Sequence, residues 1–321
     1  QPQQRPAATQ EATPAPAPAA QTAVAPASSL PVFTPSAGTD VKVETPLYSA
    51  VIYSGGGILR SFTLKHYDET IKADSPKVNL ISPEASQTAP LGLTVNGQPS
   101  WSTGQWSLDS GEQNLKLDAG QQGALRLVGV VDNLRVVREL TFNADSYLIK
   151  EKIRLINAGD QPRSVRVSYT VASDASNAAG GRYDSMRVAW DNDGSLSEES
   201  SGKTLESTGV QATGKIYWAG AMSTYFLSAV LPGETNNVTV KGLLQKTVYR
   251  TAVEEPENLL APGQEKELTV SYWLAPSCRP CPISWPRAST WACSASSPRV
   301  CSGCWSSFTS TCITGAWPLF C

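Results

Sequence analysis

The side chains that could do chemistry are few and scattered in this sequence. His66, in the strand-like run LKHY, is the only histidine among 321 residues. A metal site built from several histidines is therefore excluded, and a Ser-His-Asp or Cys-His arrangement would depend on this one residue. Because His66 lies beside a turn, we expect a surface or half-buried strand histidine rather than a catalyst.

Paired carboxylates are the next candidates, at Asp191/Asp193, Glu198/Glu199 and Glu254/Glu255. The first pair resembles the start of a calcium loop, but Thr204 stands where the bidentate glutamate would be required. We therefore interpret that pair as a turn, and Glu254-Glu255-Pro256 as solvated. No catalytic, cofactor-binding or metal-binding residue is predicted.

Aromatic side chains offer a binding role instead of a catalytic one. Tyr217, Trp218 and Tyr225 are the candidate groove or partner contacts. Four tryptophans could extend the same apolar groove: Trp101, Trp106, Trp190 and Trp273. Aromatic residues in a β-sandwich lie more often in the core than in a groove, so both interpretations stay open.

The seven cysteines all lie between Cys278 and Cys321. CRPC and CSGC have the spacing of zinc or redox pairs. Residues 276–321, however, are rich in Ser, Cys, Trp, Pro and Arg without a strand or helix period, which is typical of GC-rich coding DNA read in the wrong frame. Read one base earlier, their codons permit an apolar run entered by Phe-Asp-Met-Gly-Leu-Phe-Gly. We therefore interpret this tail as a frameshift product in place of a transmembrane region.

The strands that would position any site are clearest in Leu134–Val171. Apolar and polar residues alternate there with the period of a sheet that has one buried and one wet face. Turn residues separate three segments, so the stretch predicts an antiparallel meander. Strand-like runs fill residues 39–275 with no amphipathic helix of ten residues. The expected fold is therefore all-β, a large antiparallel β-supersandwich.

Three loop regions interrupt this domain. Gly55-Gly56-Gly57 lacks the ending of a phosphate loop and predicts a turn or bulge between strands. Asn96-Gly97 predicts a hairpin. Ser173–Gly214 is rich in Gly, Ser, Asn and Asp, and we expect the longest irregular stretch there, with one strand at Met186–Trp190.

Composition bounds the rest of the chain. Residues 1–38 consist mostly of Pro, Ala, Gln, Thr and Ser, which predicts a disordered, partly polyproline linker. The whole chain carries 26 basic and 28 acidic side chains. This balance excludes an electrostatic footprint for nucleic acid.

Four segments carry a family resemblance in their order along the chain: VKVETPLYSAVIYSGGGILRSFTLKHY, LRVVRELTFNADSYLIKEKIRLINAGDQP, GKIYWAGAMSTYFLSAVLP and LTVSYWLAP. Together they resemble the large periplasmic domain of the YidC-type membrane protein insertases, over about residues 40–275. In that family the last strand leads to a Tyr-x-Gly-Pro-Lys turn and then to a transmembrane segment. The shifted reading frame restores both features.

The resemblance implies a galactose-mutarotase-like fold without cofactor or enzymatic activity. It implies a domain on the periplasmic side of the bacterial inner membrane, anchored there in the full-length protein. The implied partners are the Sec translocon, its accessory subunits and nascent membrane proteins whose insertion and folding it assists. No site residue is carried over, because the family's insertase activity resides in a transmembrane bundle that this sequence does not encode.

Two other classes of protein remain as alternatives. One is a mutarotase-like carbohydrate-active enzyme or binder, although such enzymes usually need several histidines with a carboxylate. The other is a secreted adhesion or sugar-binding β protein with a Pro-rich stalk.

Overall fold

The computed structural model describes residues 37–277, except residues 71, 104, 110–113 and 175–185. The predicted linker 1–38 and tail 276–321 therefore lie almost wholly outside the described residues. Within the described residues the fold is all-β, as the sequence predicts, with sheets of nine, six, five and two strands. No helix in the described ranges has the length and hydropathy that crossing a bilayer requires.

The nine-stranded sheet contains, in spatial order, β15 (Ser195–Glu199), β14 (Arg187–Asn192), β17 (Ile216–Met222), β18 (Phe226–Pro232), β22 (Glu265–Pro276), β11 (Leu148–Ile156), β10 (Leu134–Asn143), β9 (Gln122–Val131) and β7 (Gln105–Leu108). The six-stranded sheet contains β16 (Val210–Gly214), β19 (Val238–Gln245), β20 (Val248–Glu254), β13 (Val167–Asp174), β5 (Leu93–Val95) and β6 (Gln98–Pro99).

The five-stranded sheet contains β4 (Lys77–Asn79), β3 (Ile58–Asp68), β2 (Tyr48–Tyr53), β1 (Asp40–Glu44) and β8 (Asn114–Lys116). A small ribbon pairs β12 (Arg163–Val165) with β21 (Asn258–Leu260). The helices are α1 (Pro83–Ser86), α2 (Ser100–Thr103) and α3 (Gly202–Ser207).

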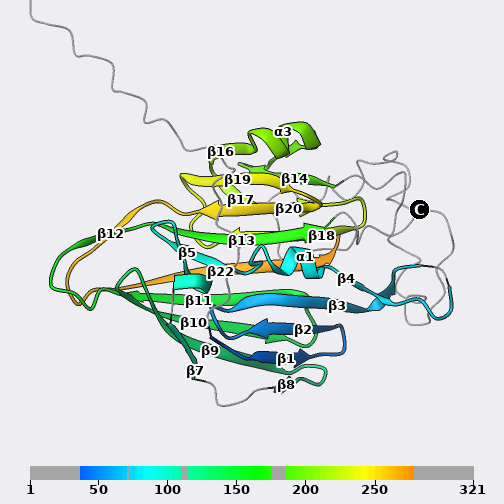
Figure 1. Cartoon of the computed structure of the whole chain (residues 1–321), viewed down its shortest axis with the longest axis horizontal. Coiled ribbons are helices and arrows are strands. Elements are labelled where there is room, and N and C mark those ends of the chain that lie inside the picture. The colour runs from blue at the N-terminus through cyan, green and yellow to red at the C-terminus, as the bar shows by residue number, and fades with distance from the viewer. Residues whose placement is uncertain (1–36, 71, 104, 110–113, 175–185, 278–321) are drawn as a thin grey trace, which may run out of the picture.

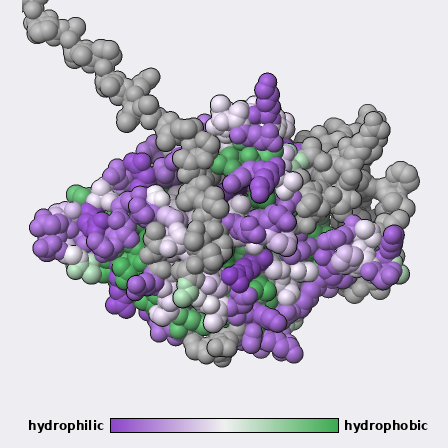
Figure 2. Space-filling view, viewed as in Figure 1, coloured by the Kyte–Doolittle hydropathy of each residue, from purple (hydrophilic) through white to green (hydrophobic). Residues whose placement is uncertain are grey.

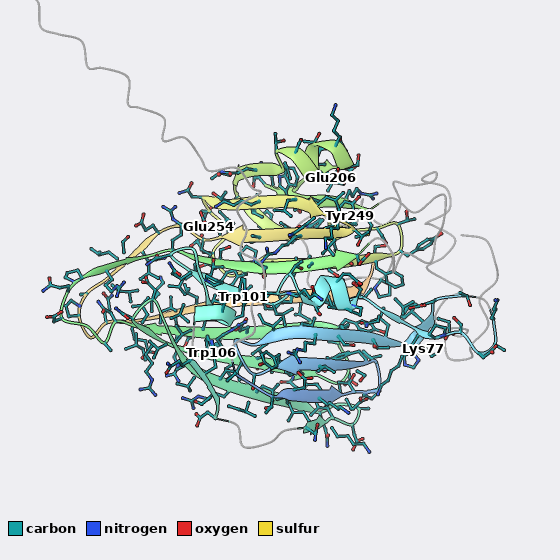
Figure 3. All side chains as sticks on the ribbon, viewed as in Figure 1. Lys77, Trp101, Trp106, Glu206, Tyr249 and Glu254 are labelled. Carbon is teal, nitrogen blue, oxygen red and sulfur yellow. The ribbon has the colours of Figure 1, made fainter. Side chains whose placement is uncertain are left out.

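The sheets form two layers (Figure 1). The six-stranded and five-stranded sheets lie one above the other in front, and the nine-stranded sheet lies behind both. The main core fills the space between the layers, with aromatic contacts such as Tyr48 stacked on Phe62 at 4.6 Å between ring centroids. Short helices cover edges, as α3 does beside Tyr249, whose position near Glu206 is visible in Figure 3.

The predicted turns are confirmed. Gly56 and Gly57 have φ of 111° and 71° in the turn between β2 and β3. A Cβ on Gly56 would lie 2.7 Å from Trp101 Cα, so glycine is also required there by the close approach of α2. Asn96 and Gly97 likewise have φ of 50° and 76° and connect β5 to β6.

The predicted three-stranded meander is only partly right. β10 and β11 pair antiparallel as expected, but the third segment leaves their sheet. After β12, strand β13 pairs with β20 and β5 in the opposite layer. All eight residues of β13 are buried, because the loop carrying α1 covers the face that the alternation predicted to be wet. Alternating polarity therefore identified a strand here but not its exposure.

The prediction of a long irregular stretch at Ser173–Gly214 is wrong over its second half. The strand predicted at Met186–Trp190 is confirmed as β14, and residues 175–185 lie outside the described residues, but β15, α3 and β16 occupy most of residues 195–214. Asp193 and Gly194, with φ of 53° and 83°, make a tight hairpin between β14 and β15, and the Gly194 N–H donates to Asp191 Oδ1 at 2.7 Å. The predicted turn at this carboxylate pair is thus confirmed. Polar edge strands such as β15 resemble loops in composition, which explains the error.

Candidate functional site

Strand β22 shows how the outer face of the nine-stranded sheet is divided. Its inward side chains, which include Val270, Tyr272 and Leu274, belong to the main core between the two layers. Its outward side chains change from exposed at Glu267 to buried at Trp273 and Ala275. The outer face is therefore charged near the start of β22 and apolar near its end.

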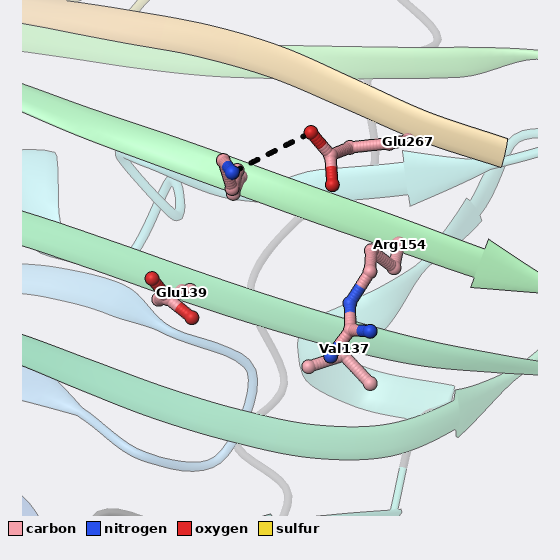
Figure 4. A pocket seen from close by; sticks show the side chains of 5 residues that line it. Val137, Glu139, Arg154 and Glu267 are labelled. Atoms are coloured by element: carbon pink, nitrogen blue, oxygen red, sulfur yellow. Dashed lines mark ion pairs between the residues drawn. The ribbon is translucent and has the colours of Figure 1, made fainter.

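The charged part forms a shallow depression of about 210 Å³ (Figure 4). It is lined by Val137, Glu139, Lys152, Arg154 and Glu267. Lys152 Nζ lies 3.6 Å from Glu267 Oε1, and both side chains are about half exposed. Such exposed pairs are screened by water and salt and contribute little stability. The depression offers charged hydrogen-bonding groups but little apolar surface for a ligand.

The apolar part is a second buried cluster on the opposite side of the strands from the main core. It consists of Ala189, Trp218, Met222, Leu227, Ala229, Trp273 and Ala275. Tyr217 packs against it, because a β-bulge opposite Asp191 and Asn192 inserts this residue beside Trp218. We call these residues the outer apolar cluster. The structure thus brings together two of the three predicted contact residues.

The third predicted contact residue, Tyr225, lies apart from the outer apolar cluster. It occupies the turn between β17 and β18, where its side chain is 45% exposed. Its carbonyl oxygen accepts a hydrogen bond from Ser277 N–H at 2.8 Å, directly after β22 ends. Trp218, in contrast, is only 1% exposed. A contact role for Tyr217, Trp218 and Tyr225 stays a prediction.

A buried ion pair in the main core was missed by the sequence reasoning. Arg138 Nε lies 2.5 Å from Glu151 Oε1, and Arg138 also donates to the carbonyl oxygens of Gly56 and Leu91. The Tyr272 hydroxyl donates to Glu151 Oε2 at 2.9 Å. Burial favours the neutral form of Arg138, but Glu151 and nearby tyrosines outweigh it, so the pKa of the guanidinium is raised.

The sequence did contain a signal for this pair. Arg138 shares the inward parity of β10 with core residues, and Glu151 does the same on β11. Two opposite charges at apolar positions of paired strands indicate a buried ion pair. Both side chains are fully buried and hydrogen-bonded to the protein, so this network positions strands rather than reacting with a ligand.

The side chains considered for catalysis lie in different environments, from exposed to buried. His66 is exposed on β3, which confirms the surface prediction. Burial raises the pKa of Asp191, although hydrogen bonds from Gly194 and Trp218 oppose the shift. Glu255 was predicted to be solvated and is 3% exposed, because the chain after β20 turns inward and its N–H donates to Val167 O at 2.9 Å. The described residues hold no group of three metal-ligating side chains.

Comparison with known proteins decides the family. The family model described as the YidC periplasmic domain matches residues 40–278. The chain belongs to this family. The Membrane protein insertase YidC of Nitratidesulfovibrio vulgaris strain DP4 is 50% identical over 278 residues, which are 85% of this chain and 51% of that protein. The protein of the same name from Lawsonia intracellularis is 44% identical over 77% of this chain and 46% of its own length.

The chain therefore spans about half the length of the curated relatives that it matches. Among solved structures, a galactose mutarotase-like protein from Lactobacillus casei aligns with a TM-score of 0.50 and 11% identity. The alignment covers 74% of this chain and all of that protein. At this identity the likeness shows the fold alone, and it confirms the predicted mutarotase-like supersandwich.

Proposed function

We propose that this chain provides the periplasmic domain of a membrane protein insertase of the YidC type. The observation that carries the proposal is the family match over residues 40–278, supported by 50% identity to a named insertase over 85% of the chain. The domain would act without catalysis, by contacting other proteins. It would stand on the periplasmic side of the bacterial inner membrane, attached through parts of the protein outside this fold.

The partners in this proposal are nascent membrane proteins, the Sec translocon and its accessory subunits. The outer face of the nine-stranded sheet supports such contacts, because exposed charged side chains stand near the start of β22 and the exposed Tyr225 stands beside its end. Tyr225, in the turn between β17 and β18, is 45% exposed, so it is the most accessible of the three predicted contact residues. Exposed aromatic side chains are frequent contact residues in protein interfaces.

The alternative of a carbohydrate-active enzyme has the fold in its favour but not the side chains. The single histidine, His66, is exposed on β3, and no second histidine exists to assist it. Aldose mutarotation above the buffer rate that is abolished by His66→Ala would support this alternative. We expect no such activity, measured by polarimetry.

The insertase proposal is tested by domain replacement. Residues 40–277 would replace the equivalent domain in a full-length relative, and insertion of a Sec-dependent membrane protein would be measured by protease protection. We expect insertion and copurification with the translocon to be retained. Tyr225→Ala in the same chimera should weaken copurification without changing the amount of protein. A chimera that folds but neither inserts nor copurifies would contradict the proposal.

A further inference from the structure

A cleft at one end of the sandwich contains the carboxylate that the sequence predicted to be solvated. Its volume is about 340 Å³. It lies where the β18–β19 turn, the end of β20, strand β21 and the start of β22 meet. The lining is mixed: Leu268 and Pro256 supply apolar surface, and polar groups come from Glu234, Asn236, Glu255, Asn258 and Lys266.

Glu255 is the buried acid of this cleft. Its side chain is 3% exposed, and its Oε1 atom has no hydrogen-bond partner of ordinary geometry, although the Tyr169 hydroxyl and the Glu234 N–H lie close enough to the carboxylate to lower its pKa. The neighbouring Tyr169 hydroxyl, fully buried, also lacks a partner of ordinary geometry. A buried carboxylate oxygen whose nearest donors are poorly placed is costly, so the site can accept a better-placed donor.

The charges around the cleft are not paired with each other. Glu234 is exposed at the rim, where its Oε1 accepts a hydrogen bond from Asn236 N–H at 2.8 Å. Lys266 lies close enough to lower the pKa of both carboxylates. Within the part of the chain that the structure describes, however, Lys266 forms no ion pair with either carboxylate.

We propose that this cleft binds an ammonium or guanidinium group carried on an alkyl stem. Glu255 and Glu234 accept its hydrogen bonds, and Leu268 and Pro256 pack against the stem. Charge-assisted hydrogen bonds of this kind are roughly twice as strong as neutral ones. The fold has already desolvated Glu255, so the ligand meets a preorganised acceptor. Such a group comes either from a basic side chain of a polypeptide or from a free polyamine, and the proposal does not depend on the insertase assignment.

The site should respond to pH in a defined direction. Burial raises the pKa of Glu255 to about 7; the charge of Glu234 adds to the shift, whereas Tyr169, the Glu234 N–H and Lys266 oppose it. Below this pKa the carboxyl group is neutral and attracts a cation weakly. For one proton and a pKa of about 7, binding at pH 6 should be roughly tenfold weaker than at pH 8.

Isothermal titration of the full chain tests the proposal with two probes, spermidine and the peptide acetyl-Ala-Arg-Ala-amide. We expect at least one to bind at pH 8 and to bind about tenfold more weakly at pH 6. Binding of the peptide alone identifies a polypeptide as the source, and binding of spermidine alone identifies a polyamine. Glu255→Gln should weaken binding at pH 8 and remove its pH dependence.

Two further variants serve as controls. Glu257→Gln changes a nearby exposed carboxylate that pairs with Arg166 at 3.2 Å outside the cleft, so binding should not change. Lys266→Ala should strengthen binding, because it removes a competing cation. Glu255→Gln resembles the protonated wild type, so its thermal unfolding should match that of the wild type at pH 6. No binding of either probe at pH 8, or equal binding by Glu255→Gln, would overturn the proposal.

Discussion

Two buried arginines differ in whether their charge is compensated by neighbouring groups. Arg138 is fully buried and satisfied by Glu151 and two carbonyl oxygens. Arg250, on β20, is also fully buried, but none of its three nitrogen atoms has a hydrogen-bond partner. The centroid of the Trp101 ring lies 6.0 Å from its guanidinium carbon. Removing each charge should therefore have opposite consequences for stability.

Arg138→Met should lower the free energy of unfolding by about 3–5 kcal/mol, because Glu151 would stay buried without a counter-charge. The double variant Arg138→Met, Glu151→Leu should recover much of this loss, since no buried charge remains. Urea unfolding followed by far-UV circular dichroism measures both. Equal losses in the single and double variants would show that the pair is not coupled.

Arg250→Met should leave the free energy of unfolding unchanged or raise it by about 1 kcal/mol. Burial lowers the pKa of Arg250 to about 10, which expresses the same penalty on its charge. Arg135→Met on the exposed face of β10 is the matched control, with an expected change within about 0.5 kcal/mol. A loss above about 2 kcal/mol for Arg250→Met would mean that the guanidinium is satisfied in solution.

At the scale of elements, the sequence predicted strands better than it predicted their partners. Alternation located β10 and β11 because both lie in a sheet with one wet face. It could not show that β13 crosses to the other layer, because pairing depends on distant segments such as β20. The same limit applies to Glu255, whose burial results from strands far apart in sequence. The alternation of apolar and polar residues thus predicts individual strands. The cleft around Glu255 depends on which distant strands pair, and alternation does not predict that.

The β17–β18 hairpin depends on a close backbone approach at Gly220. A Cβ there would lie 2.6 Å from Ala229 Cα and closer still to the Ser228 carbonyl oxygen. Gly220→Ala should therefore force the strands apart and cost about 1–3 kcal/mol of unfolding free energy. Gly202→Ala is the control, because its Cβ would meet only Leu244 Cδ2 at an ordinary 3.7 Å. Thermal melts that are equal for both variants would contradict this account of the hairpin.

At the scale of the whole molecule, β22 joins the two halves of the nine-stranded sheet. It pairs with β18 on one side and with β11 on the other. Each half also packs against a different sheet of the front layer (Figure 1). The viewed face of the molecule is mostly hydrophilic (Figure 2). The two halves are therefore held together by the buried core residues along β22 rather than by that surface, and we call this part of the core the seam.

Val270 lies at the centre of this seam, since it stands opposite both Glu151 of β11 and Pro232 of β18 and is 2% exposed. Val270→Ala should cost about 2 kcal/mol of unfolding free energy through lost packing. Because β22 serves both halves, hydrogen exchange should show amides of β10 and of β17 losing protection by the same free energy. Leu259→Ala, at a side chain 71% exposed on β21, is the control and should change neither. Loss of protection confined to one half would mean that the halves unfold independently and that β22 does not couple them.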